Sequence, residues 1–201
     1  LVLNRTAVPN ADKTHQLIKR CQQNGTKIVY DVDDDLINVS GHPEEAHYRE
    51  LLPAVFQWLT CADCVWASTE VLRERLHVFA ERIEVIPNAL DESLWHLTDP
   101  AKASQPKQNK IRILYMGTAT HDQDLELLKK AIENIQQQKQ DLVEFDLIGV
   151  ATDKDSPWYK VRKIPLIINQ SYASFVSWLR EQGPYDIGVA PLEENFFNCS
   201  K

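Results

Sequence analysis

Short apolar runs alternate along the chain with longer segments in which an apolar residue recurs every three or four positions. A short run bounded by turn residues is typical of a buried strand of a parallel sheet, and a longer periodic segment is typical of an amphipathic helix. Strands that alternate with helices are joined by right-handed crossovers, so the pattern predicts an α/β fold with parallel sheets. The predicted strands are 1–3, 27–30, 64–67, 82–86, 111–116, 143–148, 161–168 and 186–190, and the predicted helices are 12–23, 44–59, 70–80, 122–140 and 172–182.

Individual residues predict how several of these elements begin, bend and end. Ser68 or Thr69 can cap the helix that follows, and Gly183 is expected to close the last predicted helix. Pro53 lies inside a predicted helix and should kink it or mark a restart. Pro165 has no N–H for a central ladder, so its strand is predicted to lie at a sheet edge.

The periodic pattern loosens between residues 99 and 110, where only alanines and prolines are apolar. Such a segment is typical of an exposed loop or linker. The sequence therefore predicts two Rossmann-like parallel-sheet lobes. We expect the first lobe at residues 1–87, a hinge and linker at 88–110, and the second lobe at 111–201.

The composition narrows the class of protein. With 43% hydrophobic and 25% charged residues among 201, the chain has ordinary globular composition and can bury a core. No run approaches the roughly 20 apolar residues of a membrane span, and the first residues lack the features of a signal peptide. The net charge of −7 argues against a nucleic-acid-binding surface, so any anionic ligand must be held locally.

The four cysteines are too few for a disulfide scaffold in a chain of this size. Cys61 and Cys64 have the spacing of a redox motif, but no second pair of cysteines or histidines accompanies them, so we expect them to be packing residues. A reduced, cytoplasmic protein is the simplest interpretation. A cytoplasmic protein that contacts the inner face of the membrane peripherally is the alternative.

A polar cluster follows the last predicted strand, 186–190. In open α/β sheets, ligands bind in the crevice outside the carboxyl ends of the strands, which is where this cluster is predicted to lie. The alternative is a solvated loop, since loops are polar in general. The candidate binding residues of this cluster are Glu193, Glu194, Asn195, Asn198 and Lys201.

Two further segments follow predicted strands. Residues 31–36 carry four carboxylates, whose repulsion is costly unless a cation, a hydrogen-bonding ligand or helix amides offset it. A solvated acidic turn is the alternative. Gly117 and Thr118 lead from a strand into a helix N-terminus, where unpaired amides and the helix dipole favour an anion.

Four stretches resemble, in the same order, the landmarks of glycosyltransferases with the two-lobed GT-B fold. The stretches are 63–69 (DCVWAST), 85–91 (VIPNALD), 113–118 (ILYMGT) and 186–192 (DIGVAPL). They most resemble the retaining group called family 1 or family 4 glycosyltransferases. Because members of this group extend beyond both ends of this chain, the resemblance implies a fragment whose two lobes are each incomplete.

The resemblance also implies roles for particular residues. It places the hinge at 87–91, where Ala89 replaces the usual glycine, and it makes Asp33 and Asp34 the candidate catalytic residues on the acceptor side. The family's basic pair after the first glycine turn is missing here. Asp122 and Asp124 stand in that region and should compete with a ligand for the helix amides. The implied donor-binding residues are Gly117, Thr118, Glu193, Glu194, Asn195, Phe197, Asn198 and Lys201.

The expected activity is transfer of a sugar from a nucleotide-sugar donor to a hydroxyl of a glycan or lipid-linked acceptor, in polysaccharide or glycoconjugate assembly. The resemblance implies a retaining reaction with no metal and no cofactor beyond the donor. A non-catalytic GT-B-like binding module is one alternative. The other is a magnesium-dependent phosphatase of the haloacid-dehalogenase type, suggested by Asp31 and Asp33 after a strand, although Asp34 and Asp35 depart from that motif.

Overall fold

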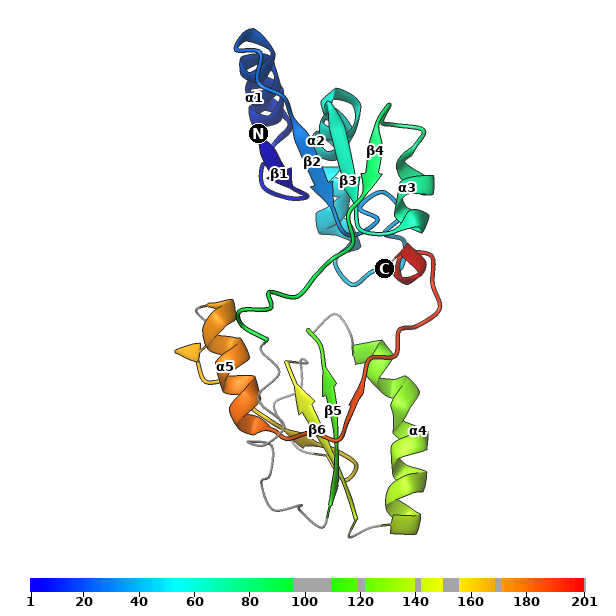
Figure 1. Ribbon diagram of the computed structural model, residues 1–201. Coiled ribbons are helices and arrows are strands. Elements are labelled where there is room, and N and C mark those ends of the chain that lie inside the picture. Colours follow the sequence, from blue (N-terminus) through cyan, green and yellow to red (C-terminus); the bar gives the residue numbers. More distant parts are fainter. Residues whose placement is uncertain (96–109, 119–121, 140–141, 150–155, 169–170, 201) are drawn as a thin grey trace. The chain divides into compact units, whose positions relative to one another are not determined.

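The computed structural model describes residues 1–95, 110–118, 122–139, 142–149, 156–168 and 171–200 (Figure 1). The chain forms two compact units. The first comprises Leu1–Ala89 together with the C-terminal residues from Glu194 onward, and the second comprises Leu90–Glu193. Each unit contains a four-stranded sheet in which all neighbouring strands are parallel, so the predicted α/β fold with two Rossmann-like lobes is confirmed.

The first sheet has the sequential order β1-β2-β3-β4. Because every right-handed crossover steps in the same direction, the three helices between these strands lie on one face of the sheet. A single cluster of buried residues from the helices and the strands fills the space between them. The elements are β1 Val2–Asn4, α1 Ala11–Gln23, β2 Val29–Val32, α2 Glu45–Cys61, β3 Cys64–Ala67, α3 Glu70–Leu76 and β4 Ile83–Val85, with the short helix η4 Asn198–Ser200 also in this unit.

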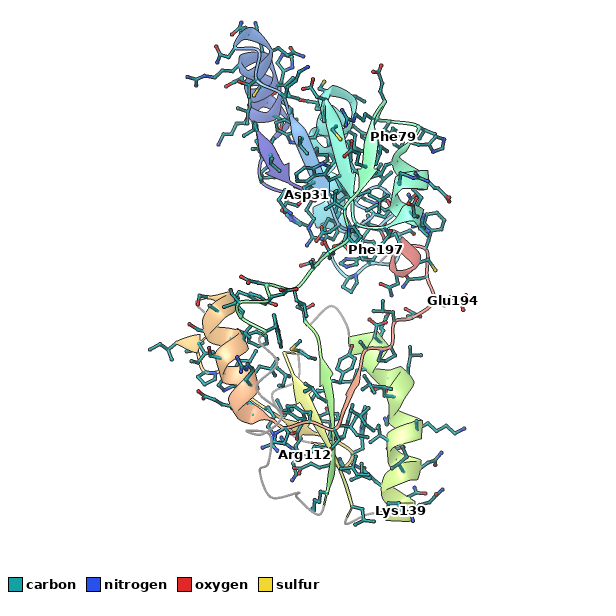
Figure 2. The ribbon with its side chains drawn as sticks, viewed as in Figure 1. Asp31, Phe79, Arg112, Lys139, Glu194 and Phe197 are labelled. Carbon is teal, nitrogen blue, oxygen red and sulfur yellow. The ribbon has the colours of Figure 1, made fainter. Side chains whose placement is uncertain are left out.

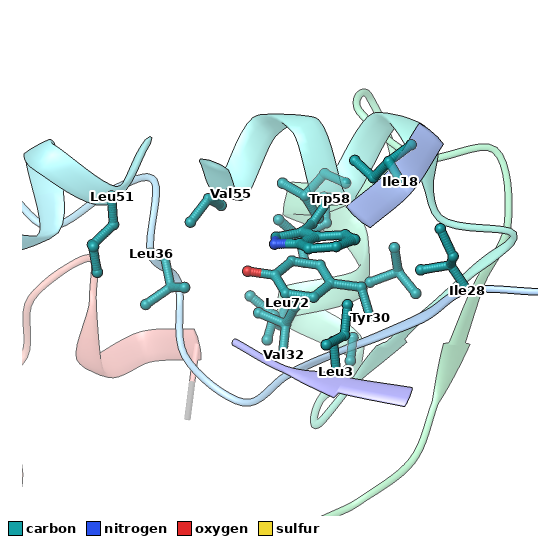
Figure 3. Packing of buried hydrophobic residues seen from close by; sticks show 14 of the residues in the cluster. Leu3, Ile18, Ile28, Tyr30, Val32, Leu36, Leu51, Val55, Trp58 and Leu72 are labelled. Carbon is teal, nitrogen blue, oxygen red and sulfur yellow. The ribbon is translucent and has the colours of Figure 1, made fainter. Parts of the chain in front are cut away.

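Aromatic side chains lie at the centre of this core. Figure 3 shows Trp58 of α2 over the ring of Tyr30 in β2, and the ring centroids are 6.3 Å apart. Tyr30 and Val32 point into the core. The alternate residues Val29 and Asp31 are half-buried on the other face. This period of two is the signature of a strand with one covered face. It fixes which residues of β2 point toward α2.

The second sheet has the order β7-β6-β5-β8, so its strand order reverses at β5. From β5 the chain passes to β6 and β7 on one side, and then returns to β8 on the other side. Helices α4 and α5 consequently pack in two different clusters, α4 with Phe145 and Leu147 and α5 with Ile148. The elements are β5 Ile111–Met116, α4 Asp122–Lys139, β6 Val143–Ile148, β7 Lys160–Val161, α5 Tyr172–Gln182 and β8 Ile187–Val189.

Two predicted strands differ from the structure. The strand predicted at 161–168 is β7, which has only two residues and lies at the sheet edge, because the chain turns after it and Ile168 N–H donates to the carbonyl of Pro165. The strand predicted to be buried at 186–190 is β8, whose Ile187 is 46% exposed. The prediction of a buried strand was wrong there, because β8 pairs only with β5 among the described strands.

Helix α2 runs through Pro53 as one helix, so the restart suggested for that position does not occur. Helix α3 ends at Leu76, earlier than predicted, while Thr69 caps its N-terminus by accepting from the N–H of Leu72. Gly183 is the C-cap of α5, as predicted. Within the described part of the chain, no helix is long and apolar enough to cross a membrane. Of the predicted hinge and linker at 88–110, residues 96–109 lie outside the described residues.

Candidate functional site

A cavity of about 790 Å³ lies in the second unit, at the carboxyl ends of its strands. The residues that follow β5, β6 and β8 all contribute to its lining, together with the first turn of α5. The cavity thus lies where the strand order reverses, which is the place at which open α/β sheets bind ligands. The lining residues used below are Gly117, Thr118, Ile148, Gly149, Ile164, Tyr172, Phe175 and Ala190.

Two glycines allow the loops after β5 and β6 to approach closely. Gly117 N–H donates to the carbonyl of Ile148 at 3.0 Å. Gly149 has a φ of +82°, and a Cβ at this position would collide with the carbonyl oxygen of Gly117. At position 149, only glycine can adopt this φ and leave room for the Gly117 carbonyl without strain. Gly117 was predicted from the sequence as a candidate binding residue, whereas Gly149 was missed. The signal that could have indicated Gly149 is a glycine directly after a predicted strand.

The loop after β8 is tied to the first turn of α4. The N–H of Glu193 donates to Asp124 Oδ1 at 2.5 Å, and Asp124 is 4% exposed. Asp124 was expected to compete with a ligand for helix amides. The structure instead gives its carboxylate a backbone donor from another loop. This contact holds the residues after Pro191 beside α4.

Part of the cavity lining is apolar. Ile148, Ile164 and Phe175 contribute aliphatic and aromatic surface. Tyr172 lies at the N-terminus of α5, and its hydroxyl accepts a hydrogen bond from Trp95 Nε1 at 2.9 Å. The lining of the cavity therefore combines main-chain groups of Gly117 and Gly149 with apolar side chains.

In the first unit, Asp33 and Asp34 both form ion pairs with Arg5. Arg5 Nη1 lies 3.1 Å from Asp33 Oδ1 and also contacts Asp34 Oδ2. Arg5 follows β1 and the two carboxylates follow β2, so adjacent parallel strands bring them to the same sheet edge. Burial raises the pKa of Tyr30, which stays protonated and donates to the Arg5 carbonyl at 2.8 Å. Sequence analysis missed Arg5 as the cation that offsets the repulsion.

Asp35, the next residue, is fully buried and has a structural role. Its oxygens accept hydrogen bonds from the N–H groups of Ile37 and Asn38 and from the Asn38 side chain. Arg75 of α3 completes the site with a 3.0 Å ion pair. These contacts bind the acidic segment to α3 through its last carboxylate. Asp33 and Asp34 stay partly exposed, at 34% and 17% of their side-chain areas.

Phe197, a predicted donor-binding residue, is labelled in Figure 2 and is 5% exposed. Its ring packs against the ring of His42, with the ring centroids 4.8 Å apart. The segment around it is held on α3. Arg75 donates to the Phe196 carbonyl at 2.6 Å, and Thr69 Oγ1 donates to the Ser200 carbonyl at 2.7 Å. In the first unit, Phe197 therefore acts as a packing residue.

The predicted donor-binding residues fall into groups. Gly117 and Thr118 line the cavity of the second unit. The remaining described residues from Glu194 onward belong to the first unit, although the sequence assigned them to the second lobe. Among these, Asn195 accepts from the N–H of Asn198 at 2.8 Å. Lys201 lies outside the described residues.

In the part of the chain that the structure describes, no group of three or more His, Cys, Asp or Glu side chains is arranged to hold a metal ion. The lining of the large cavity includes no lysine or arginine among the described residues. The groups of the lining that can donate to an anion are therefore backbone amides and hydroxyls, such as those of Thr118 and Ser171. The charge that neutralises a bound anion has to come from elsewhere.

Comparison with known proteins shows the fold. No protein-family model matches the sequence, and no curated protein is significantly similar to it. The apo structure of OtsA matches with a TM-score of 0.56 and 15% identity, over 94% of this chain and 51% of that chain. A trehalose-6-phosphate synthase studied for glycosyltransfer with retention matches with a TM-score of 0.53 and 13% identity, over the same shares of each chain. The chain spans about half the length of these structures, and its fold is that of GT-B glycosyltransferases.

Proposed function

We propose that this chain belongs to a glycosyltransferase that moves a sugar from a nucleotide-sugar donor to an acceptor hydroxyl. The observation that carries the proposal is the cavity of about 790 Å³ where the strand order of the second sheet reverses. The GT-B fold supports it, because a matching structure is a synthase described as transferring a glycosyl group with retention. The match covers half of that protein, so the activity is proposed for the whole protein of which these lobes form part.

The donor would bind with its diphosphate beside Gly117 and Thr118. The N–H groups of the first turn of α4 can donate to phosphate oxygens, and the positive end of the α4 dipole favours the anion. The apolar part of the lining, formed by Ile148, Ile164 and Phe175, suits the nucleoside.

The acceptor hydroxyl would be oriented by Asp33 and Asp34. Both carboxylates are partly exposed at the carboxyl edge of the first sheet, where a carboxylate can accept a hydrogen bond from an attacking hydroxyl. Arg5 already supplies a positive charge to both, which supports a reaction without a metal ion. The acceptor is proposed to be a glycan or a lipid-linked sugar, and the reaction to retain configuration.

Thermal melting with UDP-, GDP- and dTDP-sugars tests the donor site. We expect at least one of them to raise the melting temperature of the protein. Ala190→Leu places extra atoms in the cavity and should abolish the shift. Ala173→Leu makes the same change at an exposed position of α5 and should leave the shift intact. A panel without any shift, or a full shift in Ala190→Leu, would remove the donor from this cavity.

A further inference from the structure

Tyr172, which lines the large cavity, receives a hydrogen bond from Trp95. Tyr172 is 54% exposed, so packing alone leaves its ring free to change rotamer. The indole Nε1–H of Trp95 donates to the Tyr172 hydroxyl at 2.9 Å and fixes the position of that hydroxyl. An indole nitrogen can only donate, so the hydroxyl is the acceptor, and its own proton can still be donated to a ligand.

Trp95 is itself held on the core of the second unit. Its ring packs against the buried cluster that includes Ile148 of β6 and Trp178 of α5. Phe175 packs against the same cluster, and both Ile148 and Phe175 line the cavity. Trp95 therefore reaches Tyr172 from a fixed position, on the same cluster that supports the apolar part of the lining.

The main chain of residues 91–95 forms a turn, the entry turn, directly after the chain leaves the first unit. Asp91 Oδ1 accepts from the N–H and the Oγ–H of Ser93, at 2.9 and 2.6 Å. The Asp91 carbonyl accepts from the N–H of Leu94 at 3.0 Å. Arg180 of α5 donates to the Leu94 carbonyl at 3.3 Å. The entry turn is thus fastened to α5, the helix that contributes its first turn to the cavity.

We propose that Trp95 is a positioning residue of the donor site, holding the Tyr172 ring in place at the wall of the cavity. The inference rests on the proposed function for the identity of the ligand. A side chain that is already immobile loses less conformational entropy when a ligand contacts it, so the hydrogen bond from Trp95 favours binding. Because Trp95 belongs to the entry turn, binding is coupled to the order of that turn. Such coupling is reciprocal, so a bound donor should order the entry turn.

NMR of the indole N–H groups tests the link between Trp95 and Tyr172 without a ligand. The chain has five tryptophans, and the indole signal that is missing in Trp95→Phe identifies Trp95. Tyr172→Phe keeps the ring and removes the acceptor, so exchange of this indole proton with solvent should become about fivefold faster. Tyr159→Phe is the matched control, because it removes a hydroxyl at the other core cluster of the second unit and should leave the exchange rate unchanged.

Calorimetry with the UDP-, GDP- or dTDP-sugar that raises the melting temperature of the wild type tests the effect on the donor site. Trp95→Phe and Tyr172→Phe should each weaken binding about fivefold, and Tyr159→Phe should bind like the wild type. The double variant of Trp95 and Tyr172 should bind no more weakly than either single variant, because all three lack the same hydrogen bond. Donor binding to the wild type should also slow hydrogen exchange of the entry turn, and Trp95→Phe should reduce this protection.

Circular dichroism confirms that the variants are folded, which is expected because each change keeps an aromatic ring. The outcomes separate this inference from the proposed function. If none of the nucleotide sugars binds to the wild type, the proposed function fails and the inference fails with it. If one binds but exchange of the Trp95 indole proton does not respond to Tyr172→Phe, the inference alone is overturned. The same holds if the two effects on affinity multiply in the double variant.

Discussion

The carbonyl oxygen of Gly117 lies against Gly149 at the point where any other residue would place its Cβ. Two loops from neighbouring strands therefore meet through their main chains, with Gly117 N–H donating to the Ile148 carbonyl beside them. Main-chain atoms of both loops therefore contribute to the cavity lining, and the Gly117 N–H is already engaged by the Ile148 carbonyl. An anion in this cavity would need other donors, such as the N–H groups of the first turn of α4.

Gly149→Ala should destabilise the second unit. The left-handed conformation costs about 1–2 kcal/mol for a residue with a Cβ, and the collision with Gly117 adds to it. We expect a loss of at least about 2 kcal/mol in unfolding free energy, measured by urea denaturation. Gly188→Ala in β8 is the control, because no atom lies within 4 Å of the added Cβ. Equal losses in both variants would contradict the steric argument.

Arg75→Met should destabilise the first unit, because it leaves the fully buried carboxylate of Asp35 without its cation. Removal of one partner of a buried ion pair costs about 3–5 kcal/mol. Arg73→Met, on the same helix, removes an exposed pair with Glu70 and should cost less than about 1 kcal/mol. Chemical denaturation of the two variants measures the difference. The buried pair would have no special role if both variants lost the same stability.

Strands could be predicted from the sequence where apolar runs are bounded by clear breakers. The strands 64–67, 111–116 and 143–148 have the predicted bounds, because a serine or a glycine directly follows each run. The exposure of β8 could not be predicted in the same way. It depends on strand order, and the sequence does not show which strands lie side by side.

The candidate site was only partly predictable for the same reason. Gly117 and Thr118 could be identified because a strand, a glycine and a helix follow one another locally. Arg5 and Arg75 could not, because each reaches the acidic segment from another part of the chain. A cluster of carboxylates predicts that a cation is needed, but the fold decides which arginine provides it.

Asp33→Asn and Asp34→Asn should lower the turnover of the whole protein more than its affinity for the donor. Both groups are proposed to orient an acceptor, and both are partly exposed, so the fold should tolerate the change. Asp35→Asn is the contrasting variant and should act through stability. Steady-state kinetics with and without a chelator provide the measurement. Loss of activity with the chelator would reverse the assignment and make the cluster a metal site.

Stability should fall in acid partly through Asp63. The Lys27 ammonium donates to Asp63 Oδ1 at 2.6 Å and Ile28 N–H donates to Oδ2 at 2.9 Å, which holds the pKa of Asp63 below its ordinary value of 3.8. A lowered carboxyl pKa contributes stability above pH 3.8 that is lost as the pH falls through the pKa of the folded state.

Asp63→Asn should therefore flatten the acid limb of the stability profile, and Lys27→Gln should flatten it in the same direction because it removes the main cause of the shift. Urea denaturation at several values between about pH 5 and pH 2 checks both variants. Profiles parallel to that of the wild type would assign the acid sensitivity to other carboxylates.

The negative charge of the donor diphosphate has to be neutralised by a nearby cation. A helix N-terminus contributes about 0.3–1 kcal/mol to a nearby anion, and up to about 2 when partly buried, so the amides beside α4 cannot hold a diphosphate alone. The described lining of the cavity includes no lysine or arginine. The sequence-based expectation is that Lys201 supplies the positive charge. Lys201→Ala in the whole protein should weaken nucleotide-sugar binding by about 1.5–3 kcal/mol, the range for charge-assisted hydrogen bonds.

Two other variants separate this role from a general effect of charge. Asp122→Asn removes a negative charge from the first turn of α4 and should leave binding equal or stronger. Lys139→Ala removes a positive charge at the far end of the same helix and should leave binding unchanged, because the charge lies beyond the screening length from that turn. Isothermal calorimetry measures all three affinities. If Lys201→Ala and Lys139→Ala bound the donor equally well, the charge that holds the diphosphate would have to come from another residue.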